Sequence, residues 1–281
     1  MTGDETYRRL AGEGSHSPNL GGALITWVEP TKEHVHGYNR WYEDDHMVTG
    51  AMDMPFMFGA RRWVAPKWIQ HLRSPQNSRV AQPLDAGKYI GIYWISEGRL
   101  EDHEQWALGA NYRLREAGRL SYRGKDANLL EERSHVFTSF SDHIGTTYRD
   151  NDVPLNVHTL MQPYQGMMVQ VIDAKSSREE LSDWLTQSYL PKVVTGKVAL
   201  AIKFAPRALP QDKLAHVKQL DGVDKIVTVL HFLECDPRDA WDSNFASAES
   251  DIAAGGVASL GVQAAFIPTV QGTNKYVDEL F

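Results

Sequence analysis

The stretch RWYEDDH, residues 40–46, has a counterpart in the stretch DWLTQSY, residues 183–189. In both, a tryptophan stands five positions before the last residue, which is His46 in the first stretch and Tyr189 in the second. The two stretches lie about 140 residues apart, and the elements predicted around them follow the same order. We therefore interpret the chain as two copies of one small unit.

Each copy is predicted to contain four strands and two helices in the order βαββαβ. Strands are expected where β-branched and aromatic residues run between turn residues, and helices where apolar residues recur with helical spacing. The predicted strands are residues 21–29, 56–64, 88–96, 135–140, 166–174, 197–204, 225–233 and 262–268. The predicted helices are residues 33–49, 100–117, 176–194 and 238–254.

This order predicts an α+β fold made of two tandem ferredoxin-like βαββαβ units, residues 1–150 and 151–281. Such a unit carries its helices on one face of an antiparallel sheet. Because the bare face must be buried, we expect the two sheets to pack face to face as an intrachain α+β barrel. We expect the first unit to be catalytic and the second, which lacks the histidine, to be degenerate and structural.

Composition narrows the functional classes. A formal net charge of −7 argues against nucleic acid or an anionic membrane as the partner. The single cysteine, Cys235, excludes an intrachain disulfide framework. No apolar run has the length of a membrane span and no signal peptide is recognisable, so we expect a cytoplasmic protein. No nucleotide fingerprint or zinc spacing appears, so we expect no cofactor and no metal. The expected partner is a small-molecule substrate, and exposed sheet edges would allow a homodimer.

Helix geometry separates the four polar residues of the first stretch. At about 100° per residue, Glu43 and Asp44 are expected to face water, whereas Asp45 and His46 are expected to lie at the apolar face. A carboxylate and an imidazole at an apolar face need partners, because burying them unpaired is costly. One interpretation is a general acid/base histidine tuned by a neighbouring carboxylate or tyrosine.

The other interpretation is structural. His46 would complement the dipole at a helix C-terminus, and Asp45 would pair with Arg61 or Arg62. Because Tyr189 replaces the histidine in the second copy, and a purely structural role should be needed in both copies, we favour a catalytic role.

Further candidates lie on the strands and in a long insertion. Arg61 and Arg62 alternate across a strand, so one of them would face the pocket and stabilise an oxyanion. Aromatic strand residues, Tyr93 among them, could line the pocket, and the insertion over residues 65–87 could form its lid. The predicted catalytic residues are His46, Asp45, Tyr42 and Arg61. The predicted substrate-binding residues are Asn39, Trp27, Arg62, Tyr89, Trp94 and Trp68.

The segment YNRWYEDDHMVTGAMDMPFMFGARRW, residues 38–63, resembles the EthD-like branch of the dimeric α+β barrel superfamily. In that branch, the first helix carries a W-Y-x-x-E/D-H motif, followed by a proline-containing turn and a strand bearing arginine or an aromatic residue. The resemblance implies a barrel fold whose members include cofactor-free cyclases, lactone isomerases and dehydratases, and also haem enzymes. The fusion of two units and the loss of the second histidine depart from the usual arrangement and imply one active pocket per chain.

We therefore predict a cofactor-independent lyase, isomerase or cyclase in which His46 is the general acid/base. The expected substrate is a small, mostly apolar, aromatic or polyketide-like molecule with one or two oxygens, and the expected role is aromatic-compound catabolism. One alternative is a haem-dependent enzyme, for which the second half offers His158, His216 and His231 as axial ligands. Another is a non-catalytic small-molecule-binding protein.

Overall fold

The computed structural model describes residues 17–53, 55–209 and 217–281. Within these residues the protein is a mixed α and β structure built on one large antiparallel sheet. The strands of the first half are β1 (Leu20–Pro30), β2 (Met57–Val64), β3 (Arg73–Ser74), β4 (Tyr89–Ser96) and β5 (Arg133–Tyr148). The strands of the second half are β6 (Gly166–Ala174), β7 (Val198–Pro206), β8 (Ile226–Leu233) and β9 (Ala258–Pro268).

Short helices connect the strands. Those of the first half are α2 (Val35–Trp41), α3 (Leu100–Glu116) and α4 (Leu129–Glu132), with π-helical turns η1 (Tyr42–His46) and η2 (Val48–Met52). Those of the second half are α5 (Arg178–Trp184), α6 (Leu190–Val193), α8 (Pro237–Ala240) and α9 (Ala248–Ala254), with π-helical turns η5 (Leu185–Tyr189) and η7 (Trp241–Phe245). The 3₁₀ turns are η3 (Lys67–Ile69), η4 (Asn156–His158), η6 (Val223–Lys225) and η8 (Val277–Glu279). In the described part of the chain, no helix has the length and apolar character needed to cross a membrane.

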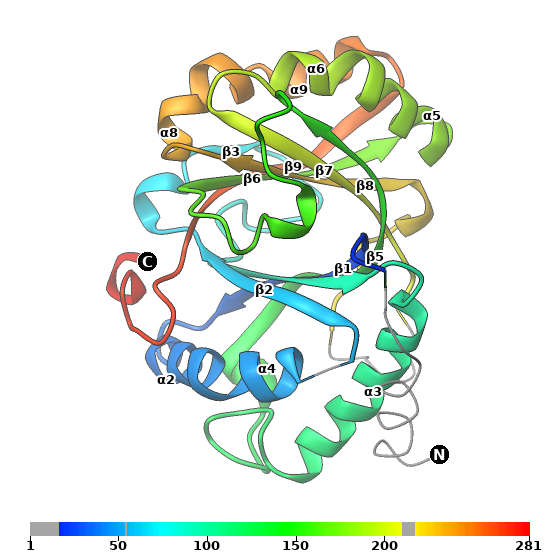
Figure 1. The fold of residues 1–281 in the computed structure, drawn as a ribbon. Helices are drawn as coiled ribbons and strands as arrows, with labels where there is room; N and C mark the ends of the chain where they lie inside the picture. Colours follow the sequence, from blue (N-terminus) through cyan, green and yellow to red (C-terminus); the bar gives the residue numbers. More distant parts are fainter. Residues whose placement is uncertain (1–16, 54, 210–216) are drawn as a thin grey trace.

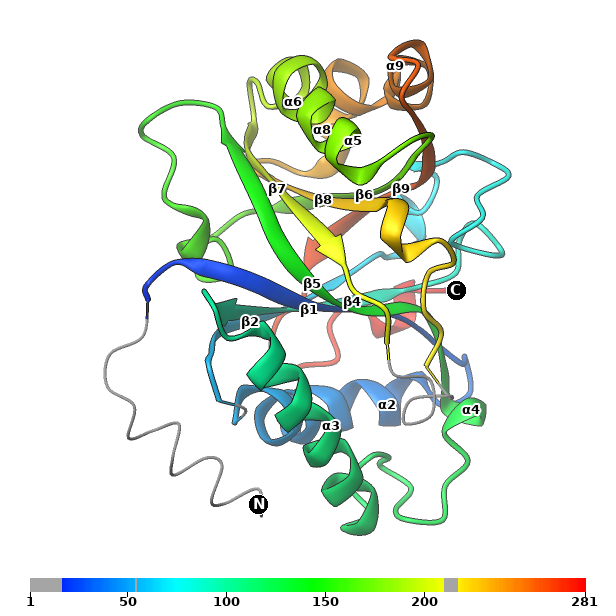
Figure 2. The same ribbon diagram turned by 90° about the vertical axis from the view of Figure 1, so that its right-hand side faces the viewer.

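The sheet closes into a ring. Its strand order is β2-β4-β1-β5-β7-β8-β6-β9-β3, and β2 also pairs with β9. Figures 1 and 2 show two curved sheets that face one another, with α2, α3 and α4 outside one and α5, α6, α8 and α9 outside the other. Strands β7 and β8 are buried at every residue, which explains their nearly continuous apolar sequences.

Aromatic rings fill the space between the two sheets. The ring of Trp27 lies 5.5 Å from that of Phe266, and Trp94 stacks on Phe204 at 5.5 Å. All four side chains are fully buried. The expectation that Trp27 and Trp94 line a substrate pocket therefore differs from their observed role, because the barrel interior in which they lie is packed with rings from both halves.

The helix predicted over residues 33–49 is an α-helix only as far as Trp41. It continues as a π-helical turn, whose i→i+5 hydrogen bonds change the angular spacing of the side chains. As a result Glu43 turns inward and is 8% exposed, whereas Asp45 is partly exposed. The expectation that Glu43 faces water and Asp45 faces the apolar side is wrong for both residues, because it assumed 100° per residue throughout.

Strand β5 is longer than predicted and joins the two sheets. Residues 141–148, which lie beyond the strand predicted over residues 135–140, continue it, and Tyr148 lies opposite Leu200 of β7. The first part of β5 pairs with β1, so one continuous strand belongs to both sheets. Strand β5 therefore joins the two halves both through the chain itself and through its hydrogen bonds to β7.

The insertion over residues 65–87 packs along the barrel. Its short strand β3 pairs with β9, and buried Arg73 donates to the Gly87 carbonyl at 2.8 Å. Trp68 donates to the Glu279 carboxylate at 2.9 Å, near the C-terminus. Backbone pairing and a buried arginine hold this segment against the second half, which differs from the expected lid that carries Trp68 over a pocket.

Candidate functional site

A cavity of about 130 Å³ lies between the outer face of the first sheet and the helices that cover it. Strands β1, β4 and β5 contribute one wall, and α2, η1 and α3 contribute the other. Most of the lining is apolar, and none of the described lining residues is Asp or Glu. The polar lining residues are Thr26, Tyr38, Tyr42, His46, Tyr93, Asn111, Arg133, His135 and Thr138.

His46 faces this cavity from the end of the π-helical turn. Its imidazole stacks on Trp41 with 4.4 Å between ring centroids and contacts Tyr42 edge-on at 5.4 Å. Nδ1 is buried beside Gly50 and has no hydrogen-bond partner in the described structure. Burial, assisted by the positive charge of Arg133, lowers the pKa of His46 to about 3, although Asp45 opposes the shift. The imidazole is therefore neutral at pH 7.

Two tyrosines that are bonded to each other line the same cavity as the histidine. Tyr42 of η1 and Tyr93 of β4 are hydrogen-bonded to each other through their hydroxyl oxygens. Burial raises the pKa of Tyr42 well above its usual value, and it also raises the pKa of Tyr93. Both hydroxyls therefore keep their protons at neutral pH, and one of the two protons is donated within the pair.

Arg133, at the start of β5, provides a positive charge in the cavity wall. It pairs with Glu132 at 3.2 Å, donates to the Leu120 carbonyl at 2.8 Å and lies 4.7 Å from the Trp41 ring. Burial lowers the pKa of Arg133. His135, two residues further along, also lines the cavity, and its Nδ1 is 2.8 Å from the Thr138 hydroxyl.

Arg133 and His135 were missing from the sequence-based candidates, and Tyr93 was a minor one. The signal for the first two was their spacing, because residues two apart on a strand point to the same face. The predicted strand began at residue 135, which left Arg133 outside it.

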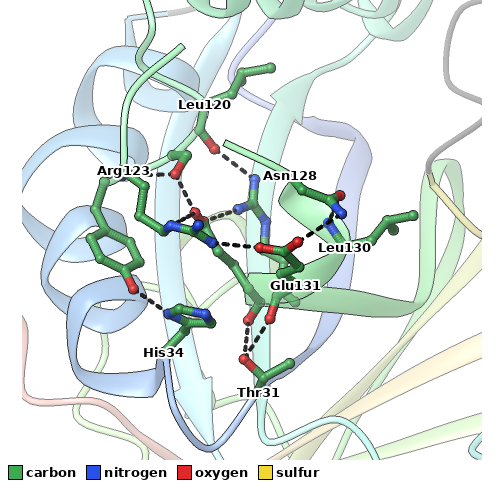
Figure 3. Close-up of polar contacts among 11 residues, drawn as sticks. Thr31, His34, Leu120, Arg123, Asn128, Leu130 and Glu131 are labelled. Carbon is green, nitrogen blue, oxygen red and sulfur yellow. Dashed lines mark hydrogen bonds and ion pairs between the residues drawn. The ribbon is translucent and has the colours of Figure 1, made fainter. Parts of the chain in front are cut away.

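The loop between α3 and β5 closes one side of the cavity through the side chain of Leu120. Figure 3 shows the polar contacts that hold this loop. Arg123 pairs with Glu131 at 3.0 Å within the loop region. His34 Nδ1 lies 2.6 Å from the Tyr122 hydroxyl, which ties the loop to the start of the first helix. The loop between α3 and β5 is therefore held by one contact within it and by one contact to the start of the first helix.

Two of the predicted catalytic residues lie away from the cavity. Asp45 forms an ion pair with Arg119 near the surface, in which the guanidinium donates a hydrogen bond to the carboxylate. Arg61 donates to the Gln162 carbonyl at 2.5 Å, and its guanidinium lies 4.8 Å from the Trp63 ring. The structure therefore brings His46 and Tyr42 together, and it separates Asp45 and Arg61 from them.

Arg62 lies behind the cavity wall and is fully buried. It donates to Asn39 Oδ1 at 2.8 Å and pairs with Glu43 at 3.1 Å, and it stacks over the Tyr89 ring at 3.7 Å. Asn39, Arg62 and Tyr89 are not among the residues that line the cavity. These predicted substrate-binding residues therefore support the site from behind.

The corresponding corner of the second half is filled. Tyr189 stacks on Trp184 at 5.6 Å, much as His46 stacks on Trp41. Its hydroxyl accepts from Gln170 at 2.8 Å, and Gln170 also bonds to Gln263 at 2.6 Å and to His231 at 3.0 Å. Gln170 thus bonds to three buried side chains, whereas His231 Nδ1 has no partner in the described structure.

The described residues fit a haem poorly. The cavity beside His46 has a volume close to the roughly 150 Å³ of an engineered cavity that holds benzene, so four pyrrole rings would not fit. His158 lines a wider cavity of about 650 Å³, but none of its described lining residues is Lys or Arg, which would neutralise haem propionates. His231 is fully buried, and His216 lies outside the described residues. In the described chain, no group of three or more His, Cys, Asp or Glu residues is arranged to hold a metal ion.

The fold resembles those of several solved proteins. An anthrone oxidase-like protein matches with a TM-score of 0.53 and 10% identity, over 90% of this chain and 93% of that chain. A dye-decolorizing peroxidase from Bacteroides thetaiotaomicron VPI-5482 matches with a TM-score of 0.49 and 7% identity, over 95% and 99% of the two chains. A putative monooxygenase from Fusobacterium nucleatum matches with a TM-score of 0.47 and 8% identity, over 89% and 93%.

At such identities the likeness concerns the fold alone. The likeness to the first of these agrees with the α and β fold of the chain. The EthD-like branch and the fusion of two copies stay predictions. No protein-family model matches the sequence, and no curated protein is similar to it.

Proposed function

We propose that the protein is an enzyme that binds a small oxygenated ring compound in the cavity of the first half, with His46 as its general acid/base. In this proposal the chain consists of two ferredoxin-like units, of which residues 1–150 carry the chemistry and residues 151–281 complete the barrel. The reaction is a proton transfer that leads to isomerisation, elimination or cyclisation. Pairing of two chains stays a prediction.

The observation that carries the proposal is the environment of His46. A buried nitrogen without a partner is uncommon in proteins, and here it belongs to a ring that faces a cavity. His103 and His231 also bury one unpaired nitrogen each, but their other nitrogen is bonded, to the Pro55 carbonyl and to Gln170 respectively. His46 differs from both because its ring lines the cavity.

Cavity size narrows the substrate. A volume of about 130 Å³ suits one aromatic ring, so the polyketide-like substrates considered from sequence are reduced to single-ring compounds. The mostly apolar lining favours a ring, and the polar groups near His46 favour at least one oxygen on it.

A neutral imidazole with a pKa of about 3 is a weak base in the empty site. It becomes an effective one when proton transfer creates an anion beside it, because the imidazolium and the anion then stabilise each other. Asp45 contributes from outside the cavity, since its charge raises the pKa of His46. In this proposal Asp45 tunes the histidine and does not contact the substrate.

The test is turnover by His46→Gln on a single-ring phenol, enol or lactone found by screening the unmodified protein. We expect a loss of about 10²-fold or more, because glutamine keeps the size and polarity but cannot take up the proton. The matched control is Tyr189→Phe at the equivalent position of the second half, which should stay within a few-fold of the unmodified protein. A folded His46→Gln protein with full turnover, or equal losses in both variants, would contradict the proposal.

A further inference from the structure

One of the two hydroxyl protons of Tyr42 and Tyr93 is not used in the hydrogen bond between them. Each phenol has one O–H donor, and one of the two protons lies in the bond between them. Among the described residues neither hydroxyl has another side-chain or backbone partner. Both tyrosines line the cavity, so the second proton is available to a ligand oxygen.

Gly91 makes room for this pair. A Cβ atom at that position would lie 2.6 Å from the Tyr42 hydroxyl oxygen and 3.1 Å from that of Tyr93, which is too close for any other residue without displacement. Gly91 lies opposite Thr26 on β1, and the residue opposite Gln170 on β6 is Val229. The space beneath the hydroxyls is therefore a feature of the first half.

The surrounding charge favours an anion at this point. The fully buried Arg62 guanidinium is 4.2 Å from the Tyr42 ring, and Arg133 lines the cavity. Burial lowers the pKa of His46, and the positive charges of Arg133 and Arg62 lower it further. Burial raises the pKa of Tyr93, and Arg62 opposes this more strongly than Glu43 reinforces it.

Resting on the proposed function, we propose that the Tyr42–Tyr93 hydroxyl pair is an oxyanion site that holds the ligand's ring oxygen as a phenolate or enolate. The O–H bond of the ligand breaks, its electron pair stays on the oxygen, and the proton passes to Nε2 of His46. A ligand that is ionised before it binds gives its proton to solvent instead. The one free O–H of the pair is a donor already placed in an apolar cavity, and it stabilises such a charge with little reorganisation. Arg62 is a positioning residue, because it has no contact with the cavity.

The test uses 4-nitrophenol, a single-ring phenol whose phenolate form is yellow, titrated from acid to alkaline pH with and without saturating protein. We expect the apparent pKa of the bound phenol to fall by about one unit or more, which is a tenfold change in its ionisation constant. Tyr93→Phe and Tyr42→Phe should each reduce that shift, because either change removes one hydroxyl of the pair and its polarisation of the other. Two variants are used so that the result does not depend on the folding of either one.

The matched control is Tyr89→Phe, which deletes a buried hydroxyl that has no partner in the described structure and does not line the cavity. It should keep the full shift. Binding of the colourless phenol with a raised pKa would overturn this inference and leave the ring-binding cavity intact. Equal shifts in Tyr93→Phe and Tyr89→Phe would overturn it as well. Absence of binding, measured by calorimetry, would overturn both this inference and the proposed function.

Discussion

The two halves of the chain differ at one corner of the fold, where the first encloses a cavity and the second encloses hydrogen-bonded side chains. In each half the strand register places a row of four residues across the outer face of the sheet. In the first half this row is Arg62, Gly91, Thr26 and Thr138. In the second half it is Lys203, Val229, Gln170 and Gln263.

The rows differ in side-chain length at three of their four positions. Glycine and two threonines leave space above β4, β1 and β5, whereas a valine and two glutamines reach across the same space in the second half. The glutamine amides then bond to each other and to Tyr189. The strand pairing in the two corners is alike, so side-chain volume along the rows contributes to the difference between them.

The cations at the end of each row are bound in equivalent ways. Arg62 bonds to two side chains of the first helix, seven and three positions before His46. Lys203 bonds to the side chains seven and three positions before Tyr189, which are Ser182 and Thr186. The equivalence supports the alignment of the two stretches that the sequence suggested. The partners differ in charge, since Arg62 alone faces a carboxylate.

Because Arg62 pairs with a carboxylate and Lys203 with neutral groups, replacing Arg62 is expected to have the largest effect on the free energy of unfolding. Arg62→Met should lower the free energy of unfolding by about 3–5 kcal/mol, because it leaves Glu43 buried without its counter-charge. Lys203→Met should cost about 1–2 kcal/mol, because its partners are neutral hydroxyls and a carbonyl. Urea unfolding of the two variants measures both values. Equal losses, or a larger loss for Lys203→Met, would break the comparison.

A smaller effect concerns pH. Each half buries a neutral histidine, and burial lowers the pKa of both His46 and His231 to about 3. Because an unfolded histidine titrates near 6.5, the unfolded state binds more protons between about pH 3 and 6.5, and stability should rise with pH across that window. Each histidine contributes a slope of at most about 1.4 kcal/mol per pH unit.

Replacing His46 or His231 by glutamine should flatten this dependence in the urea unfolding free energy between pH 5 and 7. A saturating ligand should change the slope through His46 alone, since His231 has no described cavity beside it. An unchanged slope in both variants would contradict the burial of neutral histidines.

Much of the fold could be predicted from the sequence because its signals are local or repeated. The four helical segments and eight longer strands follow from apolar spacing, and the Trp41 and Trp184 alignment holds in space, where each tryptophan stacks on the ring five residues later. The length of β5 was missed, because polar residues 141–148 gave no strand signal and pair with β7 only in the folded barrel.

The site was predicted less well, for two physical reasons. The π-helical turn rotates the residues after Trp41, so Glu43 points inward to Arg62, and no rule based on α-helical spacing shows this. The alternation of β1 separates Thr26 from Trp27 but does not say which face of the sheet holds empty space. That depends on the volumes of side chains that meet from distant segments, and here rings fill the barrel interior.

The central claim is that each chain holds one working cavity, in the first half. Calorimetric titration with 4-nitrophenol tests it most directly, using the unmodified protein, Thr26→Gln, which copies the glutamine of the second half, and nearly isosteric Thr26→Val. We predict one site per chain, a loss of affinity of about tenfold or more in Thr26→Gln, and affinity within a few-fold in Thr26→Val. Two sites per chain, or unchanged binding by Thr26→Gln, would contradict the account.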